Sequence, residues 1–464
     1  MKLRSGWIGM LGLLLVACAG SDGKDGKIGP PGARGPRGDA GPPGANGANG
    51  EAGPPGPKGD PGQQGLPGTM LASVDAGTAV STSCLSPCHG FTGIVSQWKA
   101  STHYATYIAN LGGEEVASWT GATACGNCHA IDGVAHRLAG DVSFKGTTGP
   151  HASLGQVNYL NSSTHAIAES TYAGSATVAV VDCTTCHAVD DTNDPHKTGK
   201  NYTPGSFPLR VPTSSSDQML IEKSSTAGVS DGTQAGPYGK GNACIFCHKS
   251  RKDVTNYIAA SNKLTSTFWG PHEGPQADIY TGKGGYHYAG QTYKSSSHQA
   301  FTDGCIKCHM PPVASNDGIG DHSFKPQLAT CQAAGCHATA TSFDVIGGQS
   351  LMEAGIQELR VTLNNLGWLT RSTAAPYEPL SSTDLVDDQF QTDVVRPQNY
   401  TAAPDGGKPP SPLTADQAGA LYNYLLLARG AAGGVHNPVY VRELVYDSVK
   451  ALTGKAPQTL PIRP

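Results

Sequence analysis

The sequence predicts a fibrous N-terminal stalk followed by a folded part of coil and short α-helices, with little β-structure and a helical lobe at its C-terminal end. Three observations predict this. The chain has 464 residues and 61 glycines, and 17 of these recur at strict three-residue intervals between Gly20 and Gly68. All but one of its 13 cysteines belong to short units that end in His. Hydrophobic residues make up only 38%, so something other than side chains must fill part of the core.

The N-terminus has the pattern of an export signal. Lys2 and Arg4 precede an apolar run over residues 7–16, and the tetrapeptide Leu-Val-Ala-Cys ends at Cys18. The run is too short to span a bilayer, so we expect a signal peptide over residues 1–17 and not a membrane helix. The tetrapeptide resembles a bacterial lipobox, which implies cleavage before Cys18 and lipidation of that residue. Ala19 at the next position favours the outer membrane, so the sequence predicts an exported outer-membrane lipoprotein at the cell surface.

Residues 20–67 are sixteen uninterrupted Gly-X-Y triplets, three of them Gly-Pro-Pro. Because only Gly fits at the crowded axis of three wound polyproline-type chains, this pattern predicts a collagen-like triple helix. At about 3.1 Å per residue the segment would extend roughly 150 Å. We therefore expect residues 18–68 to form a lipid anchor and a collagen-like stalk that makes the protein a homotrimer. A single-chain extended spacer is the alternative.

Apart from Cys18, every cysteine lies in one of six units in which His directly follows the second Cys. The units are Cys84-Cys88-His89, Cys125-Cys128-His129, Cys183-Cys186-His187, Cys244-Cys247-His248, Cys305-Cys308-His309 and Cys331-Cys336-His337. In such a unit two thiols can bond to the vinyl groups of one haem while the adjacent His ligates the iron. Disulfides and zinc sites are the alternatives, but neither explains a His after the second Cys in all six units. The sequence therefore predicts six covalently bound haem c groups.

Two of the units depart from the usual spacing. Three residues separate the cysteines of the first unit and four separate those of the last, whereas the other four units have two. We expect all six to bind haem, because both variants occur among c-type cytochromes and the extra residues can bulge out of the loop. The large, flat haem macrocycles then supply the apolar core that the side chains lack.

The sixth coordination position of each iron needs a second ligand, and ten histidines lie outside the units. Local patterns select seven of them, with His151 as a further candidate. The seven are His103, His165, His196, His272, His298, His322 and His436. Three follow Ser-Thr or Ser-Ser a short way before a unit, two follow a Pro that stiffens the approach, and His322 lies nine residues before Cys331.

His436 has the clearest predicted setting, the corner of a helical hairpin. Thr414 and Gln417 predict a capping box that opens a helix, and Gly433-Gly434 ends the helical run. Asn437 and Pro438 predict the N-cap and first turn of a second helix that stops at Gly454. The residues expected on the inward faces are Leu421, Leu425, Ala428, Val441, Leu444, Val445 and Leu452.

The segment before this hairpin predicts one more helix. Five apolar residues keep helical spacing over residues 349–369 and are expected to pack in the core; they are Met352, Ile356, Leu359, Leu363 and Leu366. Residues 372–411, rich in Pro, Thr and Asp, predict a long loop. We therefore divide the folded part into a hexahaem domain over residues 69–337 and a helical lobe over residues 338–464.

The six units resemble those of multihaem c-type cytochromes of metal-reducing bacteria. So do Gly270-Pro271-His272-Glu273-Gly274-Pro275-Gln276 and Gly434-Val435-His436-Asn437-Pro438, and the resemblance covers residues 80–455. It implies the fold of a multihaem cytochrome c, in which coil and short helices wrap a continuous chain of bis-His low-spin haems. It also implies an outer-membrane or extracellular location. The collagen-like stalk is not part of the usual pattern of that family.

These features predict an electron carrier and not an enzyme, with no catalytic residue. The expected partners are other c-type cytochromes and extracellular electron acceptors such as metal oxides. A pI near 6.4 leaves no basic surface for nucleic acid. One alternative is a multihaem reductase of nitrite or hydroxylamine, for which His136 with Arg137, or His287 between two tyrosines, could deliver protons. Another is a filament subunit that shares a His ligand across an interface.

Overall fold

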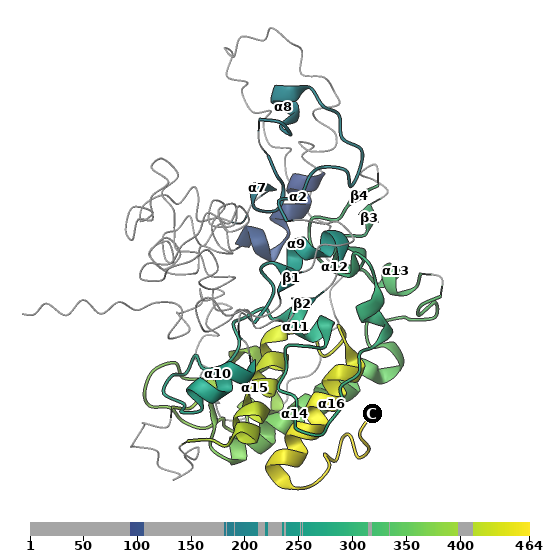
Figure 1. Ribbon diagram of the computed structural model, residues 1–464. Helices are drawn as coiled ribbons and strands as arrows, with labels where there is room; N and C mark the ends of the chain where they lie inside the picture. Colours follow the sequence, from purple (N-terminus) through teal and green to yellow (C-terminus); the bar gives the residue numbers. More distant parts are fainter. Residues whose placement is uncertain are drawn as a thin grey trace, which may run out of the picture.

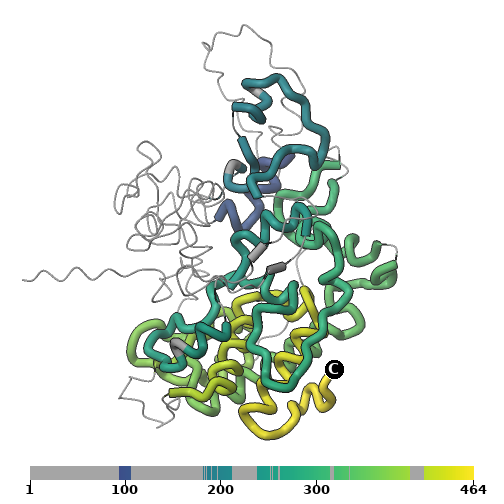
Figure 2. Tube along the Cα trace, in the orientation of Figure 1, coloured from purple at the N-terminus to yellow at the C-terminus, as the bar shows by residue number. Residues whose placement is uncertain are grey.

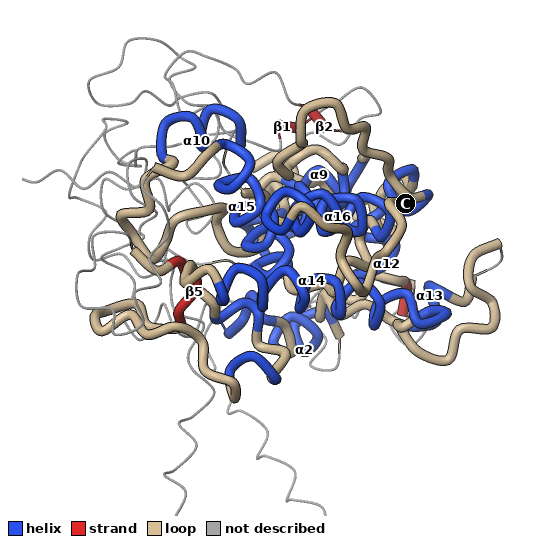
Figure 3. Tube along the Cα trace, turned by 90° about the horizontal axis from the view of Figure 1, so that it is seen from below, coloured by secondary structure: helices blue, strands red, loops and turns tan. Residues whose placement is uncertain are grey.

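The computed structural model describes residues 93–105, 181–211 except 182 and 190, 219–220, 234–235, and 238–464 except 251, 253, 314–317, 334 and 398–411. The predicted signal peptide, the stalk and the first two Cys-His units lie outside these residues, as do His136, His151 and His165. The structure is mostly helical with little sheet, as the sequence predicts, and long connecting segments join the helices (Figure 1, Figure 3).

The C-terminal lobe is built on three helices, α14 (Gly348–Asn365), α15 (Ala415–Gly430) and α16 (Pro438–Thr453). Helix α16 packs against both of the others, and together they form the lower part of the molecule in Figure 1. Their side chains make up most of the largest hydrophobic cluster among the described residues. This lobe therefore has a conventional side-chain core.

Helix α14 confirms four of the five predicted core positions. Met352, Ile356, Leu359 and Leu363 are buried, but Leu366 is 39% exposed. The helix ends before Leu366 because Gly367 adopts a left-handed conformation, and the amide of Trp368 donates to the carbonyl of Leu363, 3.1 Å away. Trp368, 1% exposed, occupies the core place that the helical spacing assigns to Leu366.

Helix α15 begins with the predicted capping box. The Thr414 hydroxyl accepts from the amide of Gln417 at 3.2 Å, and the Gln417 side chain accepts from the amide of Thr414 at 3.0 Å. Residues 418–430 are buried without exception, so the helix has no solvent face and is central to the lobe. The prediction that Gly433-Gly434 ends it is wrong, because the helix stops at Gly430 and Ala431 caps it in a left-handed conformation.

Helix α16 begins at Pro438 and stops at Gly454, as predicted. Val441, Leu444 and Val445 are buried, and Leu452 is partly buried against the same cluster. Asn437 is the N-cap residue, as predicted, but its side chain makes no capping hydrogen bond. Its amide group is used elsewhere, as described below.

The remaining elements are short. Helices are α2 (Ile94–Lys99), α7 (Cys183–Cys186), α8 (Pro195–Thr198), α9 (Asn242–Ile245), α10 (Val254–Ser261), α11 (Gln276–Thr281), α12 (Gly304–His309) and α13 (Leu328–Cys331). The 3-10 turns are η1 (Gly239–Gly241), η2 (Ser297–Ala300), η4 (Val345–Gly347), η5 (Asp384–Val386) and η6 (Phe390–Thr392). Each helix of the described part is too short or too polar to cross a membrane.

Three antiparallel strand pairs, each two residues long, make up the sheet of the described residues. They are β1 (Met219–Leu220) with β2 (Gln234–Ala235), β3 (Pro312–Val313) with β4 (Ile319–Gly320), and β5 (Leu369–Thr370) with β6 (Val394–Val395). In the registers, Met219 faces Ala235, Pro312 faces Gly320 and Leu369 faces Val395. The predicted loop over residues 372–411 carries η5, η6 and β6 in its described part.

Candidate functional site

Four Cys-His units are described, and each begins in or next to one turn of helix. Helices α7, α9, α12 and α13 contain the first cysteine of the third, fourth, fifth and sixth units. In the third and fourth units the carbonyl of the first Cys accepts from the amide of the unit's own His at 2.9 Å. This turn brings both thiols and the imidazole to one place.

The longer sixth unit closes in the same way. The amide of His337 donates to the carbonyl of Cys331 at 2.8 Å, although two more residues intervene than in the fourth unit. Gly335 takes a left-handed conformation with φ of 82°, which lets the extra residues turn outward. Of the intervening residues, the described ones, Gln332, Ala333 and Gly335, are exposed.

The eight described cysteines of these units form no disulfide. Cys183 and Cys336 are exposed, and the other six are partly buried. No group of three or more His, Cys, Asp or Glu side chains in the described part has the arrangement of a metal site. The thiols are therefore chemically available within their units.

Each of the four described motif histidines has one of the seven candidate ligand histidines as a ring neighbour. The ring centroids are 6.3 Å apart for His187 and His322, 5.9 Å for His248 and His103, 6.1 Å for His309 and His436, and 6.1 Å for His337 and His298. Imidazole nitrogens ligate first-row metal ions at about 2.0–2.1 Å. Two rings on opposite sides of one ion then have centroids roughly 6 Å apart, so all four pairs fit a shared iron.

Hydrogen bonds to backbone carbonyls set the tautomer of several of these rings. Nδ1 of His309 donates to the Phe324 carbonyl at 2.9 Å, and Nδ1 of His322 donates to the Gly320 carbonyl at 2.8 Å. His298 and His187 do the same to the carbonyls of Val435 at 2.9 Å and Pro208 at 3.3 Å. Because a carbonyl only accepts, Nδ1 carries the hydrogen and the lone pair lies on Nε2, as a metal ligand requires.

His436 is half-buried in the corner between α15 and α16. Burial, together with the nearby His309, His298 and His248, lowers its pKa to about 4, so the ring is neutral at pH 7. Its Nδ1 is buried and has no hydrogen-bond partner. A neutral ring that has an inaccessible nitrogen without a hydrogen-bond partner is suited to be a metal ligand.

The corner residues 435–437 serve two ring pairs at once. His436 belongs to the pair with His309, while the carbonyl of Val435 accepts from His298 of the sixth unit's pair. Asn437 ties the two together, because its Oδ1 accepts from the amide of Ser296 at 2.8 Å. Its Nδ2 donates to the Ser295 hydroxyl at 3.1 Å and to the Tyr280 carbonyl at 3.2 Å.

Residues 320–324 connect three of the four pairs. Their His322 is the ring neighbour of His187, and the carbonyl of Phe324 accepts from His309. The Phe324 ring also meets the ring of His103 edge to face, with centroids 4.7 Å apart. Phe324 takes a left-handed conformation with φ of 57°, which is uncommon outside glycine. One short segment thus contacts the pairs of the third, fourth and fifth units.

The segment over residues 270–276 joins the fourth unit to α15. Gln276 Oε1 lies 3.1 Å from Nδ1 of His248 and accepts its hydrogen, while Gln276 Nε2 donates to the Gly430 carbonyl at 3.2 Å. Glu273 forms an ion pair with Arg429 of α15 at 3.2 Å. Sequence reasoning missed the role of Gln276, although the motif that contains it was the available signal.

The four units lie next to one another in chain order, running from α7 through α9 and α12 to α13 (Figure 1, Figure 2). A hydrogen bond with Cys305 raises the pKa of the Cys244 thiol well above its usual range; burial and neighbouring thiols, including Cys186, raise it further. Burial raises the pKa of Cys308, and Cys331 adds to the effect. Each unit therefore has a cysteine close to one of the next.

Three of the seven candidate ligands are not in these pairs. His165 lies outside the described residues, and His196 is in α8 with its side chain outside them. His272 lies near the surface, and its Nδ1 donates to the Glu273 carbonyl at 2.8 Å. His287, named for the reductase alternative, is part of an aromatic cluster: its ring stacks on Tyr293 with centroids 4.2 Å apart, and its Nε2 lies 2.9 Å from the Tyr440 hydroxyl.

Comparison with known proteins bears on the N-terminal part. The family model Collagen triple helix repeat (20 copies) matches residues 18–74, which confirms the predicted collagen-like segment and extends slightly beyond it. The chain matches no curated protein and no solved structure.

Proposed function

We propose that the protein is a hexahaem c-type cytochrome that relays electrons outward from the outer membrane to extracellular acceptors or partner cytochromes. The observation that carries this proposal is the spacing of the four imidazole pairs, 5.9–6.3 Å between ring centroids, next to four Cys-His units. In each pair one ring belongs to the unit itself and the other to a candidate that the sequence selects. Three of the four partners lie more than 100 residues from the unit that they face.

Each unit would hold its haem through two thioether bonds and the ring of its own His. The opposite ligands would be His322 for the third unit, His103 for the fourth, His436 for the fifth and His298 for the sixth. The first two units would draw on His165, His196, His272 or His151. A bound haem supplies a one-electron iron couple whose potential depends on its axial ligands and their hydrogen bonds.

The protein's own residues would hold the ligands and set their electron donation. Backbone carbonyls keep Nδ1 protonated, which presents Nε2 to the iron and raises the basicity of the ring. Two rings saturate the iron and leave no position for a substrate, which favours a carrier over an enzyme. The contiguous order of the units supports transfer by short hops, from the third unit through to the sixth.

The N-terminal segments would place this chain of haems outside the cell. The collagen repeat is consistent with three chains wound into one stalk. With Cys18 lipidated in the outer membrane, a stalk of roughly 150 Å would carry three copies of the haem-binding part towards metal oxides or other cytochromes. The stalk's length and the anchor together explain why an electron carrier would have a fibrous segment.

The test is the intact mass and the spectrum of the protein made in a host that matures c-type cytochromes. We expect six additions of the mass of haem and, in the resting ferric protein, only low-spin signals by electron paramagnetic resonance (EPR). A colourless product after correct maturation would overturn the proposal. A high-spin signal in the unmodified protein would indicate an open iron and favour the reductase alternative.

A further inference from the structure

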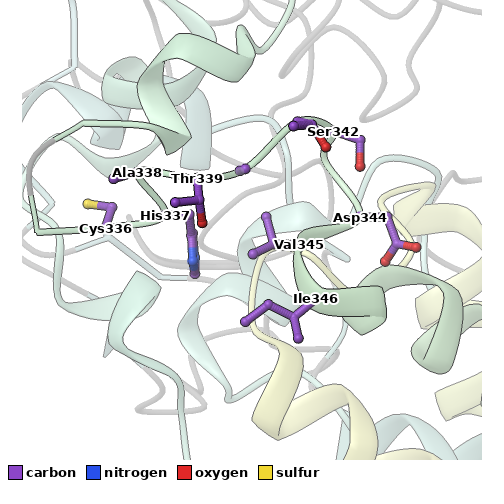
Figure 4. A pocket seen from close by; sticks show the side chains of 10 residues that line it. Cys336, His337, Ala338, Thr339, Ser342, Asp344, Val345 and Ile346 are labelled. Carbon is purple, nitrogen blue, oxygen red and sulfur yellow. The ribbon is translucent and has the colours of Figure 1, made fainter.

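The sixth Cys-His unit borders a surface cavity of about 410 Å³. Cys336 and His337 line one side, and Val345 and Ile346 of η4 line the other, with the side chains of His337 and Val345 turned towards the space between them (Figure 4). The cavity thus joins the end of the described series of units to the beginning of the C-terminal lobe.

Ile346 has two unfavourable features at once. Its φ of 56° lies in the left-handed region, where a β-branched residue is a genuine outlier. Its side chain is also 98% exposed, the most of any large hydrophobic residue in the described part. A strained backbone and an exposed apolar side chain at one residue indicate that a further interaction offsets their energetic cost.

The turn that carries Ile346 is braced from the side of α14. Asp344 Oδ1 accepts from the amides of Gln349 at 2.8 Å and Ser350 at 3.1 Å, and its Oδ2 accepts from the Ser350 hydroxyl at 2.5 Å. These bonds hold one end of the turn against the first residues of α14. The position of Ile346 therefore depends on specific contacts and is a defined part of the fold.

We propose that Val345 and Ile346 form the apolar wall of the haem carried by Cys331 and Cys336. This haem would leave one edge at the molecular surface, where electrons pass to an external acceptor. The inference rests on the proposed function. A haem tethered at Cys336 and ligated by His337 adjoins this cavity by construction, and its flat apolar face would cover the side chain of Ile346.

The accessibility of the cysteines agrees with an outlet here. Cys336 of the sixth unit is exposed, as is Cys183 at the other end of the described series, whereas all four cysteines of the fourth and fifth units are partly buried. One electron would leave through this edge to a ferric mineral or an oxidised partner cytochrome, and one from the neighbouring fifth unit would replace it. Electron tunnelling weakens steeply with the distance between the haem edge and its acceptor, so this exchange would take place at an exposed end of the series.

The test places a charge on the wall and measures haem potentials. Ile346→Glu and Ile346→Lys are compared with Val386→Glu and Val386→Lys, which alter another exposed apolar residue of the same lobe, 84% exposed. We expect Ile346→Glu to lower the potential of one haem, because a carboxylate stabilises the ferric form, and Ile346→Lys to raise it. The Val386 variants are expected to leave every potential unchanged. Spectroelectrochemical titration and EPR follow the individual haems.

Intact mass separates the two ways of failing. If the Ile346 variants retain six haems and both keep the wild-type potentials, the proposal that Ile346 lies against the haem of the sixth unit is overturned, and the proposed function stands. A potential that shifts equally in the Val386 variants also overturns it, because the effect is then not local. If the unmodified protein carries no haem, the proposed function itself is overturned.

Discussion

The hydrogen bonds on the far side of each imidazole decide what the ring can do. Where Nδ1 donates to a carbonyl, as in His298, His309 and His322, the ring has only Nε2 left as an electron-pair donor. For His248, the side-chain amide oxygen of Gln276 accepts the hydrogen of Nδ1. Only Gly320 is a close neighbour of its ring along the chain, whereas the other acceptors lie 15, 28 and 137 residues from theirs, so ligand chemistry depends on packing and not only on the Cys-His motif.

Removing one ring of a pair should open one iron. His322→Ala deletes the ring neighbour of His187, and we expect a high-spin ferric EPR signal of about one haem in six, since water then replaces a strong-field nitrogen. Added imidazole should restore the low-spin signal. The control is His287→Ala, whose ring packs on Tyr293 and faces none of the four described motif histidines. A high-spin signal of equal size in both variants would contradict the pairing.

Asp278 predicts a pH dependence of stability. Burial raises its pKa from 3.8 to about 7, although hydrogen bonds from Ser250 oppose the shift. Between these values the folded protein keeps a proton that the unfolded chain has released, so stability falls as pH rises from about 4 to 7. Asp278→Asn removes this penalty and should stabilise the protein at pH 8 by a few kcal/mol at most, on the order of 1.4 kcal/mol per pKa unit. Chemical denaturation at several pH values measures it.

Asp344 is the matched control, because its shift has the opposite sign. Hydrogen bonds from Ser350 lower its pKa, so its contribution to stability is present at neutral pH and is lost as pH falls through the lowered value. Asp344→Asn should therefore destabilise at pH 7 and have no effect at low pH. A common pH profile for both variants would refute the assignment of these shifts.

For single residues, the sequence predicted which histidines are candidate ligands but not which motif histidine each of them faces. His298 precedes Cys305 closely but is the ring neighbour of His337, and His322 lies nine residues before Cys331 but faces His187. Proximity along the chain does not predict these pairs, because the segment that precedes one unit reaches the histidine of another unit in the fold. Neither the exposed, strained Ile346 nor the acceptor Gln276 has a periodic signal that would reveal its place.

At the scale of elements, the corner between α15 and α16 acts as a clamp. Asn437, fully buried, holds the segment with His298 against the segment with His436. Asn437→Ala should leave six haems attached but shift the low-spin EPR g-values of two of them, because both rings lose a fixed orientation. Asn364→Ala is the control. The side chain of Asn364 also makes two backbone hydrogen bonds, because it donates to the carbonyl of Leu380 and accepts from the amide of Leu380, and it lies away from the ring pairs. This variant should destabilise the fold without altering the spectrum, and a spectral change in both variants would contradict the clamp.

A buried ion pair joins α14 to the segment after η6. Arg360 and Asp393 are both inaccessible, and two hydrogen bonds of 2.7 and 2.9 Å connect them. Asp393→Ala leaves the buried guanidinium with only the partly exposed Asp387, 3.5 Å away, as its ion-pair partner, and should cost about 3–5 kcal/mol in chemical denaturation. Asp191→Ala breaks the exposed pair with Lys197 and should have no measurable effect. Equal losses in the two variants would contradict this account.

Helix boundaries followed local chemistry where that chemistry is self-contained. The Thr414–Gln417 capping box and the Gly454 stop depend on neighbouring residues only, and both were predicted. The end of α15 was misplaced because Ala431, not a glycine, adopts the left-handed conformation there. Asn437 holds the predicted N-cap position, but its side-chain amide bonds residues 295–296 and not the first turn of the helix.

For the whole molecule, the collagen repeat predicts the state of association. The mature protein should be a trimer by light scattering, and deletion of residues 20–67 should give a monomer with unchanged haem spectra, since the ring pairs described lie within one chain. Gly41→Ala, in the middle of the repeat, should lower the melting temperature of the triple helix without affecting the haems. A trimer that survives the deletion would place the association in the folded part.

The sequence alone determined the repeat, the six Cys-His units and most helices of the C-terminal lobe, because each depends on residues that are neighbours along the chain or one helical turn apart. Only the tertiary structure decided which histidines face each other, which carbonyls hold their tautomers and which side chains lie beside the sixth unit. Those relations join residues as far apart as His103 and His248, or His309 and His436. Chain folding, and not spacing, brings them within about 6 Å, the distance at which two imidazoles can share one iron.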